Sequence, residues 1–461
     1  MRPGANAAIA FLICGFVFVA YILCPISQSG DSFWTVPVML SLLSEGNTNL
    51  DEYPELLREK RYQGVECVTH EYQVTPTDPA LGCPAGSHYY YWYPAGTPFV
   101  ALPLMVVMDW SLRVVGPIAD RLGGGRLGPA WRAFAQRDYL ASHLLVELAL
   151  SSAIVALATL FVFLTARVYL DLAGSIALAL LFAFATSAWS TASRALWQHG
   201  PAMLMLSIAL YLLSLATKQP ALLAWSAAPL VLAYFMRPTA SVVLVMVGAY
   251  VLIHRRSQLV KWLLAAIVTA IPFLIYNLVT YHRLLQSYFT LPLFLKPAPS
   301  NFPAILTAFA GVSVSPSRGV FVFSPFLLFS LAGIYLALRK RWMTPLSGYL
   351  AAALALHWLA LSDFQLWIAG YCYGPRLFSD VVPIFIFFLI PAYLWLRLGE
   401  PHRLLSIVFY LSVLISVLIH FRGARYWAPY EWNARPSEVS IERVWDWRDP
   451  QFLRGLYPGG K

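Results

Sequence analysis

Long apolar stretches alternate with short polar segments along most of the chain. The first runs from Ala7 to Ile26, contains no charged residue and is not followed by a small-residue cleavage site. It therefore predicts a retained transmembrane helix rather than a signal peptide. Further apolar stretches are Leu140–Ala166, Gly174–Trp189, Ala202–Ala216, Ala221–Phe235, Thr239–Ile253, Leu263–Val279, Val320–Leu338, Leu346–Leu361, Phe378–Leu396 and Leu404–Ile419. The pattern predicts an all-α polytopic membrane protein with about eleven transmembrane helices.

Basic residues between these stretches orient the predicted helices. The main basic clusters are Arg255/Arg256, Arg339/Lys340/Arg341 and Arg397/Arg403. The positive-inside rule places them in the cytoplasm. Alternation then places the following polar segments on the outer face: Ser190–Pro201, Tyr281–Gly319, Ser362–Leu377 and the tail at residues 421–461.

The segment 27–139 is predicted to be a large first outer loop. Within it, Thr97–Val115 is apolar, but a crossing there would break the alternation of the helices. Because this stretch contains Asp109, Trp110 and Arg113, we expect an amphipathic helix that lies along the outer surface. The whole chain, residues 1–461, is expected to form one transmembrane domain with a short outer C-terminal tail.

Composition supports a membrane protein and argues against nucleic-acid binding. The chain has 59% hydrophobic and 12% charged residues, whereas soluble domains average about 45–50% and about 25%. The net charge of +10 comes from basic residues that occur singly or in short clusters between apolar stretches, as topology signals do. Cys67 and Cys83 share the first outer loop. They can form a disulfide if that loop faces an oxidising compartment, and spacing alone leaves this open.

Asp31 is the candidate catalytic residue. It follows the first apolar stretch, in ISQSGDSFW. A carboxylate costs about 2.5–3.5 kcal/mol at the membrane centre and less at its edge, so an acid at this boundary indicates a function. The alternative is an acid that only marks the membrane interface.

Three arginines on the predicted outer face are candidate ligands for a lipid phosphate. Arg318 lies in SPSRGVFVFSP, Arg376 in GYCYGPRLFSDVVP and Arg237 in FMRPTA. A guanidinium group at the start of a helix can bind a phosphate through paired hydrogen bonds. A single arginine of this kind could equally reach towards lipid headgroups.

Candidate sugar- or acceptor-binding residues come from two further segments and one tyrosine. The segment SRALWQHGPA contains Arg194, Trp197, Gln198 and His199, the segment YYYWYPAG contains Tyr93, and Tyr373 precedes Arg376. Aromatic rings can stack on sugars, but they also form interfacial belts, and both interpretations stay open. Glu66, His70, Glu71 and His88 lack a recognisable metal-ligand spacing, so no metal site is assigned.

Taken together, these residues resemble the GT-C superfamily of integral membrane glycosyltransferases. That superfamily includes protein mannosyltransferases, lipid A aminoarabinose transferases, mycobacterial arabinosyltransferases and the catalytic subunits of oligosaccharyltransferases. The resemblance rests on Gly30-Asp31-Ser32 after the first helix and on Tyr93-Pro94-Ala95-Gly96 before the expected surface helix. The segments LWQHGP, SPSRG and YGPRLFSDVVP look like those of a bacterial branch.

The resemblance implies transfer of a sugar from a polyprenyl-phosphate donor to a glycan, lipid or protein acceptor, with inversion. It implies a bacterial inner-membrane protein whose site faces the periplasm, in contact with membrane lipid, with Asp31 at the active centre. Members with a paired acid carry Asp-Glu or Glu-Asp there, whereas this chain has Asp31-Ser32. No cofactor is assigned, and a divalent metal stays open. The alternatives are a lipid-linked sugar flippase or transporter and an oligosaccharide ligase or polymerase.

Overall fold

The computed structural model describes residues 3–78, 80–121, 127–136, 138–290, 301–339, 345–398 and 403–456. The described part is nearly all helical. Its longer helices are α1 (Pro3–Ile22), α2 (Thr35–Ser44), α4 (Gly96–Arg121), α5 (Leu127–Ala135), α6 (Tyr139–Tyr169), α7 (Leu172–Phe184), α8 (His199–Leu215), α10 (Ala227–Met236), α11 (Ser241–His254), α12 (Arg256–Tyr281), α15 (Phe302–Val314), α17 (Leu328–Arg339), α18 (Leu346–Ser362), α19 (Val382–Leu398) and α20 (Arg403–Arg425).

Shorter elements connect these helices. The short α-helices are α3 (Pro54–Glu59), α9 (Leu222–Trp225), α13 (Ser287–Thr290), α16 (Val320–Phe323), α21 (Ala428–Glu431) and α22 (Ile441–Val444). A π-helix, η1 (Ala188–Ala192), and four 3₁₀ turns, η2 (Pro238–Ala240), η3 (Pro325–Leu327), η4 (Arg376–Val381) and η5 (Gln451–Leu453), complete the described helical elements.

The apolar stretches are helical, as the sequence pattern predicted. Among the described residues, five helices are long and apolar enough to cross a membrane: Gly96–Pro117, Ala141–Tyr169, Arg256–Tyr281, Arg376–Arg397 and Arg403–Arg425. Several shorter apolar helices of 10–17 residues accompany them. These lengths are compatible with an integral membrane protein. Of the predicted basic clusters, Lys340 and Arg341 lie outside the described residues.

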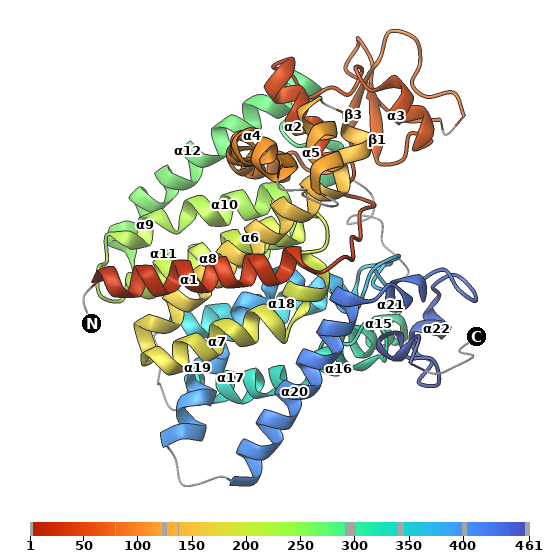
Figure 1. The fold of residues 1–461 in the computed structure, drawn as a ribbon. Coiled ribbons are helices and arrows are strands. Elements are labelled where there is room, and N and C mark those ends of the chain that lie inside the picture. Colours follow the sequence, from red (N-terminus) through yellow and green to blue (C-terminus); the bar gives the residue numbers. More distant parts are fainter. Residues whose placement is uncertain are drawn as a thin grey trace.

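The bundle has two different ends (Figure 1). The axes of helices α1, α6, α8 and α10 are roughly aligned, and α6 packs against α1, α7 and α8. Side-chain caps help to start two of these helices, because Asp138 accepts a hydrogen bond from the Ala141 N–H and Asp171 accepts one from the Gly174 N–H. The N-terminus lies at one end, whereas the strands and the C-terminal elements α21 and α22 both lie at the other. We call this second end the site end.

The first predicted outer loop contains a small β-sheet, which the expectation of an all-helical fold missed. The strands β1 (Val65–Val68), β2 (Val74–Pro76) and β3 (His88–Tyr91) form an antiparallel sheet in the order β2-β1-β3. Strands of three or four residues are too short to leave a clear alternation in the sequence. Cys67 and Cys83, whose pairing the sequence left open, are joined by a disulfide. It ties β1 to the loop that precedes β3.

Helix α4 differs in direction from the helices of the bundle. Figure 1 shows α4 nearly end-on, whereas α1, α8 and α10 are seen along their length. Over Gly96–Pro117 only 17% of the most apolar window is buried. The helix therefore presents most of its apolar surface outwards, and it contacts the bundle through α10, α2, α5 and α6.

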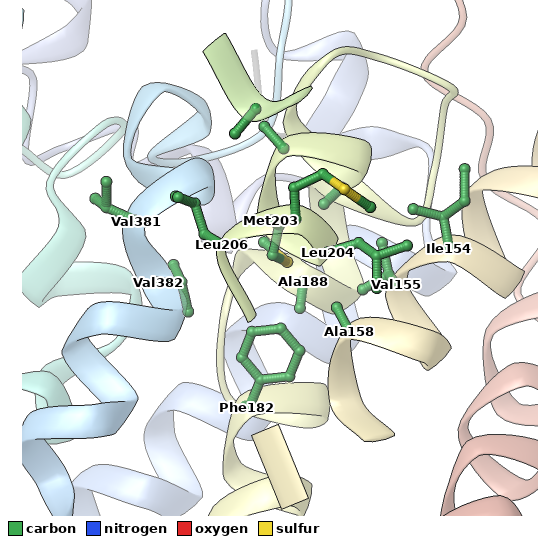
Figure 2. Close-up of a cluster of buried hydrophobic side chains, with 14 of the residues drawn as sticks. Ile154, Val155, Ala158, Phe182, Ala188, Met203, Leu204, Leu206, Val381 and Val382 are labelled. Carbon is green, nitrogen blue, oxygen red and sulfur yellow. The ribbon is translucent and has the colours of Figure 1, made fainter. Parts of the chain in front are cut away.

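A dense apolar core lies where α6, α7 and α8 meet the start of α19 (Figure 2). Val155 on α6, Phe182 on α7, Met203 on α8 and Val382 on α19 are all buried there. Large buried aliphatic and aromatic side chains resist displacement because any cavity costs free energy. This packing fixes the first turn of α8 relative to the turn η4, two elements far apart in the sequence.

Candidate functional site

Asp31 and Arg376 are in direct contact at the site end of the bundle. The Asp31 carboxylate lies 3.1 Å from Nη1 of Arg376, although the two residues are 345 positions apart. Asp31 lies in the turn between α1 and α2, and the hydroxyl of Tyr91 donates a hydrogen bond of 2.7 Å to its backbone carbonyl. Its side chain is 47% exposed, whereas that of Arg376 is 15% exposed. The acid is thus anchored through its backbone, and about half of its side chain stays exposed beside Arg376.

Arg376 also contacts the segment that precedes α8. Its guanidinium lies over the Trp197 ring at 4.6 Å from the centroid, a cation–π contact. Three buried N–H donors in this neighbourhood have no hydrogen-bond acceptor among the described residues: Nε of Arg376, Nε1 of Trp197 and Nε2 of Gln198. Buried donors are normally paired. Their clustering is the electrostatic pattern expected where an anionic or hydroxyl-rich ligand supplies the acceptors.

A second, largely buried charge cluster lies at the start of α8. The carboxylate of Asp380 is 2.5 Å from Nδ1 of His199 and 2.6 Å from Nε of Arg237. The Asp380 and His199 side chains are 2% and 4% exposed. Arg237 Nη1 also donates a long hydrogen bond of 3.5 Å to Oε1 of Gln198. Asp380 therefore neutralises Arg237 and holds His199 in one orientation, with Nε2 directed away from the carboxylate.

Tyrosines border the Asp31–Arg376 pair. Burial raises the pKa of the Tyr93 hydroxyl, and the neighbouring Asp31 carboxylate raises it further. Tyr288 packs on Tyr93 with ring centroids 5.4 Å apart, and burial raises its pKa as well. Both hydroxyls therefore stay protonated at neutral pH and can donate hydrogen bonds. Gln286 fixes this arrangement by donating to the backbone carbonyls of Tyr91, Trp92 and Tyr93.

Glu147 joins the two loops that carry Asp31 and Trp197. It lies in α6 and is fully buried. One carboxylate oxygen accepts hydrogen bonds from the Ser32 hydroxyl and from the backbone N–H of Leu196, the latter at 3.0 Å. The other oxygen has no partner among the described residues. Ser32 follows Asp31 and Leu196 precedes Trp197. The Glu147 side chain therefore sets the distance between the Asp31 loop and the Trp197 loop.

Three predicted site residues lie outside this cluster. Arg194 is fully buried and donates to the carbonyls of Tyr21 and Cys24 at the end of α1. Tyr373 is fully buried, and its hydroxyl donates 2.8 Å to the carbonyl of Ile419. The Arg318 guanidinium is buried, and all its donors are used within the protein. The structure thus gives these three side chains roles in holding backbone segments, not in facing the site.

The acidic and histidine residues of the sheet do not form a metal centre among the described residues. No group of three or more His, Cys, Asp or Glu side chains with metal-binding geometry occurs in that part of the chain. His88 instead contacts the Asp51 carboxylate at 2.5 Å. In the main site, Asp31 contacts Arg376 and Asp380 contacts Arg237 and His199. These carboxylates are each engaged with cations or histidine rather than with a second acid.

Asp380, Tyr288 and Glu147 were not among the predicted site residues. Asp380 follows Arg376 by four residues in the segment GYCYGPRLFSDVVP. An acid so close to a candidate phosphate ligand could have indicated a site residue. Glu147 was visible as an acid within an apolar stretch, a feature that usually marks function. Tyr288 carried no comparable signal, because it is one of many aromatic residues in the predicted outer loops.

No protein-family model matches the chain, and no match was found among the curated proteins or among the solved structures.

Proposed function

We propose that the protein is an integral membrane glycosyltransferase of the GT-C type. It transfers a sugar from a polyprenyl-phosphate donor to an acceptor hydroxyl on a glycan, lipid or protein, with inversion at the anomeric carbon. The observation that carries this proposal is the 3.1 Å contact between Asp31 and Arg376, beside buried N–H donors that have no acceptor in the part of the chain that the structure describes. A base for a hydroxyl and cations for a phosphate are the two groups this reaction needs.

In the proposed reaction the donor phosphate replaces Asp31 on Arg376. The released Asp31 carboxylate accepts the proton of the acceptor hydroxyl as its oxygen attacks the anomeric carbon. The bond between that carbon and the phosphate oxygen breaks, and the electron pair leaves with the polyprenyl phosphate. Arg376, Trp197 and Gln198 supply N–H donors for the phosphate and the sugar hydroxyls, and Arg237 holds Gln198 in place. Protonation of the leaving group is unnecessary, because the phosphate is already a stable anion.

His199 and the tyrosines complete the proposed sugar-binding surface. His199 lies beside Trp197, with ring centroids 6.1 Å apart, and Asp380 fixes its orientation. The Tyr93 and Tyr288 rings lie close to Asp31 and Arg376 and can pack against the apolar face of a sugar. The site thus offers aromatic faces next to hydrogen-bond donors, the combination that carbohydrate recognition uses.

Two observations support a membrane orientation with the site facing outwards. Tyr281 at the end of α12 packs near Tyr90 of the sheet, with centroids 5.8 Å apart. Arg256 at the other end of this 26-residue helix is then roughly 39 Å away, about one membrane thickness. The basic pair Arg255/Arg256 therefore lies at the end opposite the site, as the positive-inside rule requires for a periplasmic site in a bacterial inner membrane. The transverse direction of α4 suits a surface helix, and for the other apolar helices we propose about eleven crossings.

The test is a transfer assay with purified protein in vesicles. Donors are polyprenyl monophosphates that carry radiolabelled mannose, arabinofuranose, aminoarabinose or glucose, and host membranes supply acceptors. We expect the native protein to form a new glycoside from one of these donors. Replacing the base in Asp31→Asn should lower the rate about 10²–10⁴-fold.

The matched control is Asp363→Asn, which removes an exposed acid from another loop and should leave the rate unchanged. Normal transfer by folded Asp31→Asn protein contradicts the catalytic assignment. Movement of lipid-linked sugar across the vesicle membrane without a new glycoside would instead identify a flippase. Transfer only from a diphosphate-linked oligosaccharide would identify a ligase or polymerase.

A further inference from the structure

The C-terminal tail is built into the loop that carries Arg376. Two of its side chains, Asn433 and Gln451, are fully buried although they are uncharged polar residues in a short segment after the last long helix. Burying an amide costs free energy unless its donors and acceptors are satisfied. Their contacts therefore show what the tail is attached to.

Gln451 contacts the backbone of the Arg376 loop through both the oxygen and the nitrogen of its side-chain amide. Its Oε1 accepts a hydrogen bond of 3.0 Å from the Gly374 N–H, and its Nε2 donates one of 2.8 Å to the Cys372 carbonyl. The same Oε1 accepts 2.9 Å from Nη1 of Arg318. One tail side chain thus fixes two backbone groups within four residues of Arg376.

Arg318 and Asn433 extend this network around the same loop. Arg318 donates to the carbonyls of Ile368 and Gly370 at 2.6 and 2.9 Å, and to Oδ1 of Asn433 at 2.8 Å. Asn433 in turn donates 2.9 Å to the Cys372 carbonyl. The loop therefore receives hydrogen bonds from Arg318 and from both tail amides, and among the described residues none of these three side chains is hydrogen-bonded to Asp31 or to the Arg376 guanidinium.

The loop needs such support because its conformation is demanding. Gly374 has a φ of +64°, a region that favours glycine, and a Cβ there would lie 2.7 Å from the Phe323 ring. The Arg376 N–H then bonds to the Gly374 carbonyl at 2.9 Å, which closes the turn that starts η4. The backbone direction at Gly374 consequently sets where the Arg376 side chain emerges.

We propose that the C-terminal tail is a positioning element for Arg376, acting through Gln451 on the backbone at Cys372 and Gly374. The inference rests on the proposed function, in which Arg376 binds the donor phosphate. Gln451 is a positioning residue, because it touches the loop and not the substrate. The C-terminal tail is thus part of the donor site although it contributes none of the phosphate ligands.

The experiment has a readout that needs no substrate. Cys372 is a free, fully buried thiol in the held loop, so its reaction with a maleimide, mapped by mass spectrometry, reports release of the loop. We expect Gln451→Met, which keeps the side-chain length and removes the hydrogen bonds, to speed this labelling at least about tenfold. Glu442→Gln, an exposed change in the same tail, is the matched control and should leave it unchanged. Labelling of Gln451→Met at the native rate overturns the proposal.

The second readout is a double-mutant cycle on binding of undecaprenyl monophosphate. Gln451→Met should weaken binding about tenfold in the native background and have no effect in the Arg376→Ala background, because its influence passes through Arg376. Equal weakening in both backgrounds overturns the positioning role. If Arg376→Ala itself binds normally, the proposed function fails while the labelling result still stands. Should Gln451→Met fail to fold, Gln451→Glu keeps the Oε1 acceptor and removes the donor to Cys372, and the same cycle applies with a smaller effect.

Discussion

Two arginine loops that look alike in the sequence have opposite surroundings in the structure. SPSRG and YGPRLFSD each place an arginine beside proline, glycine and hydroxyl residues before an apolar helix. Arg318 is buried, and its five N–H groups go to three backbone carbonyls and two side-chain amides. Arg376 makes one hydrogen bond to Asp31, and its buried Nε has no acceptor among the described residues.

The difference shows how an arginine's role depends on which acceptors the fold supplies. Arginine has five donors in a fixed plane and stays charged. When the protein supplies every acceptor, the side chain is a structural crosslink, as Arg318 is. When acceptors are missing at a site that solvent can reach, the remaining donors are available to a ligand, as we propose for Arg376. Arg318 therefore supports the loop, whereas Arg376 is carried by the loop and, as we propose, binds the ligand.

The largest expected effect that sharpens this comparison is on Arg376. Arg376→Ala should lower the rate of sugar transfer about 10³-fold, equivalent to about 4 kcal/mol of transition-state stabilisation. Its thermal midpoint in detergent should stay close to that of the native protein, because the side chain has few protein partners to leave unsatisfied. The radiolabel transfer assay measures the expected loss of rate, and a thermal scan on the same preparation measures the expected retention of stability. A large loss of thermal stability would mean that Arg376, like Arg318, is structural.

Arg318→Ala should behave in the opposite way. It leaves three carbonyls and the amides of Asn433 and Gln451 without a donor, and we expect a stability loss of roughly 3 kcal/mol. The measurement is the thermal midpoint together with the yield of folded protein from membranes. Arg283→Ala, an exposed arginine in another loop, is the control and should change neither. A stable Arg318→Ala protein that cannot bind prenyl phosphate would make Arg318 a ligand after all.

The sequence was sufficient to predict the helices. Inside a bilayer every backbone N–H and C=O group must be hydrogen-bonded within the protein, and a helix achieves this within one segment. Long apolar stretches therefore predict helices with little ambiguity. The positive-inside rule then assigns each loop to one side of the membrane. Residues in loops on the same side can come together even when they are far apart in the sequence. Sidedness placed Arg237, Arg318 and Arg376 on the same face as Asp31 but did not indicate that Arg376 would form an ion pair with it.

The roles of Arg318, Arg194 and Tyr373 could not be predicted in the same way. Each depends on partners that are far away in the chain, such as Gln451 for Arg318 and the end of α1 for Arg194. A local motif carries no information on whether such partners are present. The same limit explains why Asp380 was missed, because its importance comes from the distant Arg237 and His199.

A smaller effect is expected at the buried acid of the second cluster. Asp380→Asn removes the counter-charge of Arg237 and should cost about 3 kcal/mol of stability, because a buried cation without a partner is strongly unfavourable. The control is Asp171→Asn, which breaks the exposed pair with Arg397, both half-exposed, and should cost at most about 1 kcal/mol. Thermal midpoints of both variants give the comparison. Equal shifts would show that burial of the Asp380 cluster contributes nothing beyond a surface ion pair.

The smallest effect is expected for Glu147→Gln. The amide oxygen of glutamine can still accept from Ser32 and from the Leu196 N–H, so the spacing of the Asp31 and Trp197 loops should survive, with a loss of about 1 kcal/mol in stability or barrier. Glu147→Ala removes both hydrogen bonds and should reduce transfer more than the glutamine variant does. Rates and thermal midpoints of the two variants, measured together, separate the hydrogen bonds from the charge. If Glu147→Gln lowers the transfer rate as much as Glu147→Ala does, the negative charge itself is required. Glu147 would then act in the reaction, as we propose for Arg376, instead of holding loops as Arg318 does.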